Sequence, residues 1–311
     1  MSNSKELYSI ILYYKYNNIK DPEYFKENHL KYCQKLDLLG RIIISKEGIN
    51  GTLSGLKTNI DEYMKYLKSI EGFEDIDFKI DFYHKHVFSK LSIKIRKEIV
   101  ALKLEQDIFP QNDPNSYLEP KNFFNLLKNK DVVVLDVRND YEYDLGHFRN
   151  SINPKINNFR DFPKWLEENK SLLKNKKILT YCTGGVRCEK ASCLLKSKGF
   201  NEVYQLKGGI IKYSQAPETQ GKLFDGQVYV FDQRIMTKVN KKEHVIVGRD
   251  FFDQTPCERY INCGNPNCNK QILCNEENEI KYLGSCSEEC SKHKQNRYVL
   301  RNENKEKLNK K

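Results

Sequence analysis

The sequence predicts a multidomain protein of mixed class. It should contain an N-terminal α+β domain, a central α/β domain around a parallel sheet, and an irregular, Cys-rich C-terminal region. Three observations indicate this division. Roughly the first hundred residues follow the order strand, helix, strand, strand, helix, strand. Between residues 119 and 217, apolar strands alternate with helices, and six of the ten cysteines lie later, between Cys257 and Cys290.

The N-terminal domain, residues 1–102, is predicted from the periodicity of its apolar residues. β-Branched and aromatic residues indicate strands, whereas apolar residues three or four positions apart indicate the helices. The expected elements are strand 7–15, helix 22–37, strand 41–45, strand 51–54, helix 59–70 and strand 78–82. This βαββαβ order describes a ferredoxin-like (acylphosphatase-like) sandwich, a fold that is compatible with many functions.

Residues 84–100 continue with a pattern of period two. Three apolar residues, Leu91, Ile93 and Ile95, alternate with polar ones, so one side of the segment is cationic. That side is either the solvated face of a strand or a strip that contacts the phosphates of a nucleic acid. Under the second interpretation, the candidate RNA-binding residues are Lys90, Lys94, Arg96 and Lys97.

Residues 103–118, with two prolines and several polar residues, are predicted to link the first domain to the second. The central domain, residues 119–217, contains expected buried strands at 131–136, 177–181 and 202–206. A helix over 189–198 ends before Gly199, which suits the residue after a helix. Strands and helices that alternate in this way predict an α/β domain with a parallel sheet.

A glycine-rich loop follows the strand that ends at Tyr181, and a helix comes after it. The loop begins at Cys182 and continues with Thr183, Gly184, Gly185, Val186 and Arg187. Glycines let successive backbone N–H groups point inward, and a helix N-terminus behind them favours negative charge at the centre. Cys182 would therefore be a reactive thiolate with a lowered pKa, the alternative being a structural cysteine in an ordinary turn. The C-x4-R spacing makes a cradle suited to a sulfur atom on the thiolate.

Further residues are expected around this loop. Asp136 and Arg138 end a strand at the carboxyl edge of the sheet, where open α/β sheets build their sites. We expect structural hydrogen bonding from Asp136 and His147, whereas Arg138 suits either a structural or a functional role. Gly208-Gly209 is expected either to bring backbone close to the loop or to form a plain turn.

Composition favours an intracellular protein with an anionic partner. The formal net charge is +11, which favours nucleic acid, although a basic proteome explains it equally well. The N-terminal apolar run is too short for a signal peptide, and no segment reaches the ~20 apolar residues that a membrane helix requires. We therefore expect a cytoplasmic protein that does not contact a membrane. The sequence indicates no oligomeric state.

The cysteine cluster suggests a metal site or reduced thiols rather than disulfides. Only the Cys263–Cys268 and Cys286–Cys290 spacings come near those typical of zinc sites. These four cysteines are the candidate ligands of one structural zinc ion, the alternative being a metal-free cluster. Residues 292–311 carry eight Lys or Arg and two Glu, which suits either phosphate contact or a solubilising tail.

The motifs together resemble a known family. The loop CTGGVRCEKAS and the segment LDVRNDYEYDLGHF resemble the rhodanese homology domain. With KEGINGTLSG, KLSIKIRKEIV and GGIIKY in the same order, the chain resembles the tRNA uridine-34 hydroxylases, which contain a rhodanese domain. This resemblance implies oxygen-dependent hydroxylation of the wobble uridine to 5-hydroxyuridine in the tRNA anticodon loop. It also implies that Cys182 is catalytic and able to carry a persulfide, with molecular oxygen as co-substrate.

The sequence shows no cofactor motif for this chemistry. The glycine pairs do not form the G-x-G-x-x-G pattern of NAD or flavin sites, and the six histidines offer no evident set of iron ligands. Two other functions remain compatible with the loop. One is a sulfurtransferase that carries a persulfide in sulfur relay or tRNA thiolation, and the other is a binding module without catalytic activity.

Overall fold

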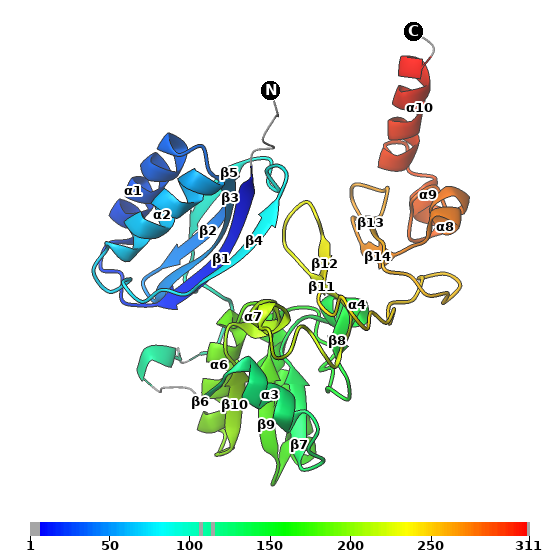
Figure 1. The fold of residues 1–311 in the computed structure, drawn as a ribbon. Coiled ribbons are helices and arrows are strands. Elements are labelled where there is room, and N and C mark those ends of the chain that lie inside the picture. The colour runs from blue at the N-terminus through cyan, green and yellow to red at the C-terminus, as the bar shows by residue number, and fades with distance from the viewer. Residues whose placement is uncertain (1–6, 106–107, 113–115, 310–311) are drawn as a thin grey trace.

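The computed structural model describes residues 7–105, 108–112 and 116–309, which form three regions along the chain (Figure 1). An N-terminal sheet carries two helices on its outer face. A parallel sheet with helices around it forms the central domain. The C-terminal region leaves the central domain and ends in α10 (Arg297–Asn309). This architecture confirms the predicted fold class.

The N-terminal domain is a five-stranded sheet in the order β4-β1-β3-β2-β5. Its first four strands have the ferredoxin-like order, and β5 adds to the edge parallel to β2. The helix α1 begins after Asp21, whose side chain accepts a hydrogen bond from the N–H of Tyr24. The elements are β1 (Tyr8–Tyr16), α1 (Pro22–Lys35), β2 (Leu39–Ser45), β3 (Gly48–Leu56), α2 (Lys57–Lys68), β4 (Phe78–Tyr83) and β5 (Leu91–Ile95).

The two faces of this sheet differ. Alternate residues of β1, such as Ile11 and Tyr13, are fully buried in the core with the residues of α1 and α2. The next residues in the alternation, including Leu12, point to the opposite face, which carries no helix. Arg41 pairs with Ser92 and Ile43 with Lys94, so the cationic side of β5 extends this open face. A strand is thus confirmed over Leu91–Ile95, the part of the period-two segment where apolar and polar residues alternate.

The central domain has a four-stranded parallel sheet in the order β6-β10-β9-β7. β6 (Ser116–Leu118) belongs to this sheet, so the stretch expected to be a linker ends in one of its strands. A short 3-10 helix, η1 (Pro110–Asn112), precedes it. The other elements are α3 (Pro120–Leu126), β7 (Val132–Asp136), α4 (Asp140–Leu145), β8 (Gly146–Phe148), η2 (Phe159–Asp161), α5 (Phe162–Leu173), β9 (Lys177–Tyr181), α6 (Val186–Ser197), β10 (Val203–Leu206) and α7 (Gly209–Gln215).

The C-terminal region is built from short elements. β11 pairs antiparallel with β8, which joins this region to the central domain, and β13 pairs with β14 in a separate hairpin. None of the helices in the described part of the chain is long and apolar enough to span a membrane. The elements are β11 (Phe224–Tyr229), β12 (Met236–Lys238), β13 (Tyr260–Asn262), β14 (Gln271–Leu273), α8 (Glu276–Lys281), α9 (Glu288–Ser291) and α10.

Buried ion pairs join the first two domains. The ammonium of Lys190, in α6, lies 2.9 Å from a carboxylate oxygen of Glu47 and 2.7 Å from one of Glu98. All three side chains are less than 10% exposed. Glu47 also accepts a hydrogen bond from the N–H of Ile99, and Glu98 accepts one from the N–H of Leu102. Because a buried charge without a partner is costly, these contacts fix α6 against the N-terminal domain.

Candidate active site

The loop after β9 turns sharply because two of its residues are glycines. A Cβ atom on Gly184 would lie 2.5 Å from Cδ2 of Leu12, and one on Gly185 would lie 2.6 Å from the hydroxyl oxygen of Tyr14. Gly185 also has a φ of +107°, a conformation that L side chains rarely adopt. The loop therefore approaches strand β1 of the N-terminal domain more closely than any side chain would allow.

Cys182 lies at the head of this loop. Its sulfur accepts a hydrogen bond from the N–H of Gly185 at 3.1 Å. Its carbonyl accepts one from the N–H of Ile210 at 3.0 Å, and the carbonyl of Thr183 accepts one from Ile211 at 3.2 Å. A Cβ atom on Gly209 would lie 2.6 Å from both carbonyl oxygens, so the expected close approach of backbone at the second glycine pair is present.

The environment of Cys182 favours its thiolate form. Burial raises the pKa of the Cys182 thiol, but the Cys188 side chain, the positive charge of Arg187 and the N–H groups of both residues lower it to about 6. Burial raises the pKa of Cys188 itself well above its usual value. Cys188 therefore stays protonated and donates its S–H to the Cys182 thiolate.

Arg187 is held by a buried carboxylate rather than pointing freely into the loop. Its two terminal nitrogens lie 2.6 Å and 2.8 Å from the carboxylate oxygens of Glu142, in α4. The hydroxyl of Thr183 donates to the same carboxylate at 3.3 Å. Burial raises the pKa of Glu142, but Arg187, together with Arg138 and the N–H of Asn139, outweighs burial and lowers the pKa. The ion pair thus holds the Arg187 guanidinium and the Glu142 carboxylate in place beside the sulfur of Cys182.

Asp136 and Arg138 form a second, fully buried ion pair. The guanidinium of Arg138 lies 2.6 Å from a carboxylate oxygen of Asp136 and donates to the carbonyl of Gly146 at 2.7 Å. Neither residue borders the cavity described below. Their position, between the end of β7 and the start of β8, is structural. His147 lies nearby, with Nδ1 2.9 Å from the carbonyl of Tyr143.

A cavity of about 920 Å³ lies between the loop and the N-terminal sheet, beside the contact of the loop glycines with β1. Cys182 forms part of its floor, although the residue itself has no solvent-exposed surface. Thr183, Gly184, Val186 and Arg187 border the cavity from the same side. The opposite wall is the open face of the N-terminal sheet, and the residues that line it there include Leu12, Tyr14, Arg41, Ile43, Asn50, Thr52 and Lys79.

Sequence reasoning identified the loop but missed this second wall. Lys79 and Asn50 lie on expected or adjoining strands, yet no local pattern distinguishes them from residues of a solvated face. A signal was available in the period-two alternation of β1 and β4, which places Lys79 opposite Leu12. The alternation shows which residues share a face of the N-terminal sheet, but it does not show that this face lies across the cavity from Cys182.

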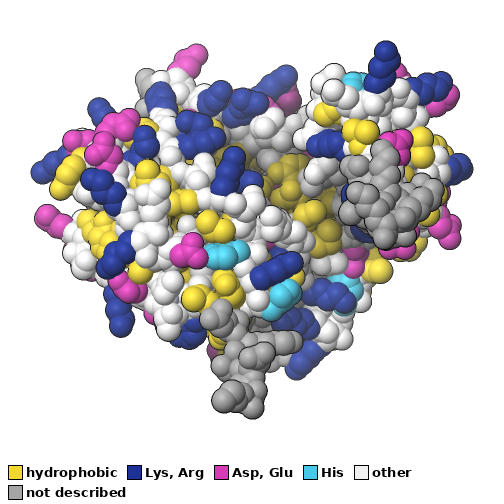
Figure 2. Space-filling view, turned by 90° about the horizontal axis from the view of Figure 1, so that it is seen from above, with side chains coloured by type: hydrophobic (Ala, Val, Ile, Leu, Met, Phe, Trp, Pro, Cys, Tyr) yellow, Lys and Arg dark blue, Asp and Glu magenta, His cyan; other side chains and the backbone are white. Residues whose placement is uncertain are grey.

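A larger groove of about 1540 Å³ continues beside this cavity, between the edge of the N-terminal sheet and the C-terminal region. Lys90, Lys94 and Arg96 line one side, while Arg249 and Lys270 line the other. Lys97 borders the first cavity. Figure 2 shows this hollow from above, with apolar side chains in its depth and Lys and Arg side chains around it. All four candidate RNA-binding residues are exposed, three of them in this basic groove and Lys97 at the adjoining cavity.

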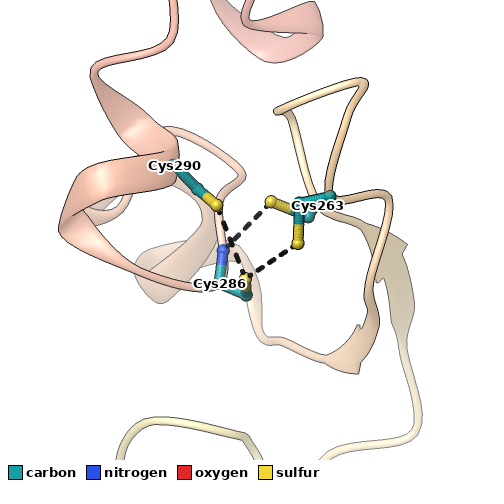
Figure 3. Close-up of side chains that lie close together, drawn as sticks. Cys263, Cys286 and Cys290 are labelled. Atoms are coloured by element: carbon teal, nitrogen blue, oxygen red, sulfur yellow. Dashed lines mark hydrogen bonds between the residues drawn. The ribbon is translucent and has the colours of Figure 1, made fainter.

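Four of the cysteines in the C-terminal region gather into one cluster. The sulfur atoms of Cys263, Cys268, Cys286 and Cys290 all lie within 4.8 Å of one another. The side chains of Cys263, Cys286 and Cys290 point toward one another from the end of β13, from the turn before α9 and from α9 (Figure 3).

Two of the sulfur–sulfur distances match those of a tetrahedral metal site. The sulfur of Cys286 lies 3.6 Å from that of Cys268 and 3.9 Å from that of Cys290. A tetrahedral ion with metal–sulfur bonds of about 2.3 Å requires sulfurs about 3.8 Å apart. The N–H of Cys286 donates to the sulfur of Cys263, as backbone groups commonly do around such ions. The cluster could therefore hold a metal ion.

Comparison with known proteins agrees with the three regions. A model of the UPF0176 acylphosphatase like domain matches residues 8–99, and one of the rhodanese-like domain matches residues 119–216. A model described as rhodanase C-terminal matches residues 225–291. The first two matches correspond to the N-terminal and central domains, and the third covers most of the C-terminal region.

Full-length relatives share one name, tRNA uridine(34) hydroxylase. A protein of Aster yellows witches'-broom phytoplasma is 60% identical over 97% of this chain and 98% of its own length. One from Acholeplasma laidlawii is 58% identical over 94% of this chain and 92% of its own length. One from Bacillus cytotoxicus is 54% identical over 96% of this chain and 92% of its own length.

The Cys182 thiol should ionise at a lower pH than an ordinary cysteine. We expect the thiolate to form with a midpoint at a pH of about 6, because protonated Cys188, Arg187 and the loop amides stabilise its charge. The thiolate should be present at neutral pH and should be lost as the pH falls through that midpoint. Ultraviolet absorbance of the thiolate, taken as the difference between the native protein and Cys182→Ser, measures it. A midpoint near 8.5, the ordinary value for cysteine, would contradict the account of the loop.

Proposed function

The chain belongs to the tRNA uridine(34) hydroxylase family, and on that premise we propose that it hydroxylates the wobble uridine of tRNA at C5 with Cys182 as its catalytic residue. The observation that carries the role of Cys182 is its position. It is a thiol with a lowered pKa on the floor of a cavity that lies within the size range of small-molecule sites, roughly 300–1,000 Å³.

The thiolate supplies a nucleophile for the pyrimidine ring. When its sulfur bonds to C6 of the uracil, the electron pair of the C5–C6 double bond moves toward the C4 carbonyl oxygen. The resulting enolate is nucleophilic at C5, the atom that receives oxygen. Molecular oxygen is the proposed co-substrate. Because only one of its atoms enters the product, the second is reduced to water and the reaction also consumes a two-electron donor. Loss of the C5 proton and of the C6–sulfur bond then restores the aromatic ring and the thiolate.

The basic groove suits the anticodon arm of tRNA. It lies beside the cavity, and Arg41 and Arg96 line both spaces, so a strand in the groove has a direct route to Cys182. Phosphate contacts from Lys90, Lys94, Arg96 and Lys97 would hold the stem while the base of uridine 34 turns out of the stack into the cavity. With tRNA as the substrate, we propose that the protein acts in the cytoplasm.

Removing the thiol of Cys182 should abolish the modification without abolishing tRNA binding. We expect Cys182→Ser to give no 5-hydroxyuridine, because a serine hydroxyl does not ionise near neutral pH. Mass spectrometry of tRNA nucleosides from cells that express only the variant measures the product, and a gel-shift titration measures binding.

The same spectra distinguish the proposed reaction from sulfur transfer. The tight C-x4-R loop around Cys182 would also cradle a persulfide, which is the feature that favours a sulfurtransferase. Nucleosides that lack an oxygen atom in the variant support hydroxylation, whereas nucleosides that lack a sulfur atom support the sulfurtransferase. Full hydroxylation by Cys182→Ser would contradict the catalytic role of this residue.

Charge reversal on β5 should weaken tRNA binding. We expect Lys94→Glu with Arg96→Glu to lower the affinity and to reduce the slope of log K against log salt by roughly 0.9 for each phosphate that the protein no longer neutralises. The matched control is Lys164→Glu with Lys174→Glu, which makes the same change in net charge on the exposed side of the central domain. If the two double variants bind tRNA with equal affinity, the cationic side of β5 is only the solvated face of a strand and does not contact tRNA.

We further propose that the four-cysteine cluster holds a structural zinc ion. All four ligands would come from the protein, which leaves no open position for a substrate and suits a structural role. The ion would join the β13 side of the C-terminal region to α9.

Purified protein should therefore contain about one zinc ion per chain, measured by elemental analysis. Cys286→Ser should lose the metal and unfold at a lower temperature, because binding of a structural metal contributes directly to folding. Cys257→Ser is the control, since Cys257 lies outside the cluster and its loss should leave the metal content unchanged. Metal-free protein whose thermal unfolding is insensitive to a chelator would exclude the zinc site.

A further inference from the structure

Lys79 is a buried cation on the wall that faces Cys182. It lies in β4, pairs with Leu12 of β1 and borders the same cavity as the active-site loop. Only 5% of its surface is exposed, although lysine is among the residues least often buried. The ammonium lies 4.7 Å from the centre of the Tyr14 ring, and Tyr14 in turn donates a hydrogen bond to Glu189 at 2.8 Å. This contact holds the lysine side chain along the open face of the sheet.

The positive charge of Lys79 is only partly balanced. Its carboxylate partner, Asp77, lies 3.3 Å away, but the same carboxylate oxygen is 3.6 Å from the ammonium of Lys212. Two ammonium groups thus share one carboxylate, and the Asp77 side chain is 49% exposed, so water weakens its attraction. Asp81, the next acidic residue on this face, is paired with Arg234. Net positive charge therefore remains at this wall of the cavity.

This charge acts on Cys182. Burial lowers the pKa of Lys79, whereas Asp77 and the Cys182 thiolate act in the opposite direction. The two groups come from different domains and border the same cavity. Apolar side chains such as Leu12, Ile43 and Ile211 line part of the cavity, and apolar surroundings strengthen interactions between charges.

We propose that Lys79 is a second catalytic residue, which the N-terminal domain contributes to hold a carbonyl oxygen of the uracil. This inference rests on the proposed role of Cys182. When the sulfur of Cys182 bonds to C6, the electron pair of the C5–C6 double bond moves to the C4 carbonyl oxygen, and that oxygen becomes negatively charged. The ammonium keeps its proton and stabilises the oxygen by a charge-assisted hydrogen bond. When the C6–sulfur bond breaks, the electron pair returns and the charge disappears.

The proposal gives the N-terminal domain a part in the chemistry besides tRNA binding. A cation held in advance opposite the nucleophile costs no reorganisation when the negative charge develops. The same ammonium favours the thiolate before the substrate enters. The ammonium of Lys79 would therefore stabilise two negative charges in turn, first that of the Cys182 thiolate and then that of the substrate oxygen.

The test compares Lys79→Met, Lys79→Arg and Lys212→Met. Methionine is unbranched and apolar like the stem of lysine and one atom shorter, so it removes the charge and keeps most of the packing. Lys212→Met removes the other ammonium beside Asp77, which lies outside the cavity. We expect Lys79→Met to lower the maximal rate of uridine hydroxylation by about 10²-fold or more, with tRNA affinity unchanged. Arginine at position 79 should restore part of the rate, and Lys212→Met should keep the full rate.

The ionisation of Cys182 provides a readout that does not depend on turnover. In Lys79→Met the thiolate should form at a higher pH than in the native protein, and in Lys212→Met its midpoint should not move. A role of Lys79 in packing alone would lower thermal stability without moving this midpoint. An unchanged midpoint together with an unchanged maximal rate in Lys79→Met overturns the proposal.

Failure of the proposed function would look different. In that case the native protein would not add oxygen to uridine, or Cys182→Ser would hydroxylate it at the native rate, whatever the behaviour of the Lys79 variants, and the inference would fall with it. If Cys182→Ser is inactive while Lys79→Met and Lys212→Met lose equal activity, only the role of Lys79 is wrong. The net charge around Asp77, rather than the position of Lys79, would then explain the loss.

Discussion

The close packing of the Cys182 loop against strand β1 is the contact on which the site depends. Gly184 lies against Leu12 and Gly185 against Tyr14, at distances that leave no room for a Cβ atom. The helix α6 follows this loop, and the buried ion pairs of Lys190 hold its next turn against the N-terminal domain. A loop that cradles a thiolate is by itself open on one side. Here a second domain closes that side and turns the cradle into a cavity with two chemically different walls.

The charges in this site are arranged in pairs that leave the sulfur ionised. Glu142 holds Arg187 in place, and Asp136 holds Arg138 below the loop, so neither guanidinium is free to fold over Cys182. Stabilisation of the thiolate then comes from fixed groups, the Gly185 amide and the Cys188 side chain among them, that need not move when substrate enters. Such preorganisation is what distinguishes a reactive cysteine from a merely buried one.

Local patterns were enough to predict the fold class, the Cys182 loop and the grouping of the four cysteines. Each of these depends either on residues that are close in sequence or on an order of strand, turn and helix that is visible in the sequence. The composite cavity was out of reach, because it depends on contacts such as that between Tyr14 and Glu189, which lie 175 positions apart. The sequence did not decide between a structural and a functional role for Arg138 for a related reason. Its burial beneath Tyr181 depends on how β7, β8 and β9 pack together.

The most direct test of the composite site is a photochemical cross-link from the substrate base. A tRNA with 4-thiouridine at position 34, bound to Cys182→Ser and irradiated, forms bonds only with groups that touch the base. Mass spectrometry of the digested complex should find cross-linked peptides from β1 or β4 as well as from the loop at 182–187. Cross-links confined to the C-terminal region, with none from the N-terminal sheet, would contradict a site shared between the two domains.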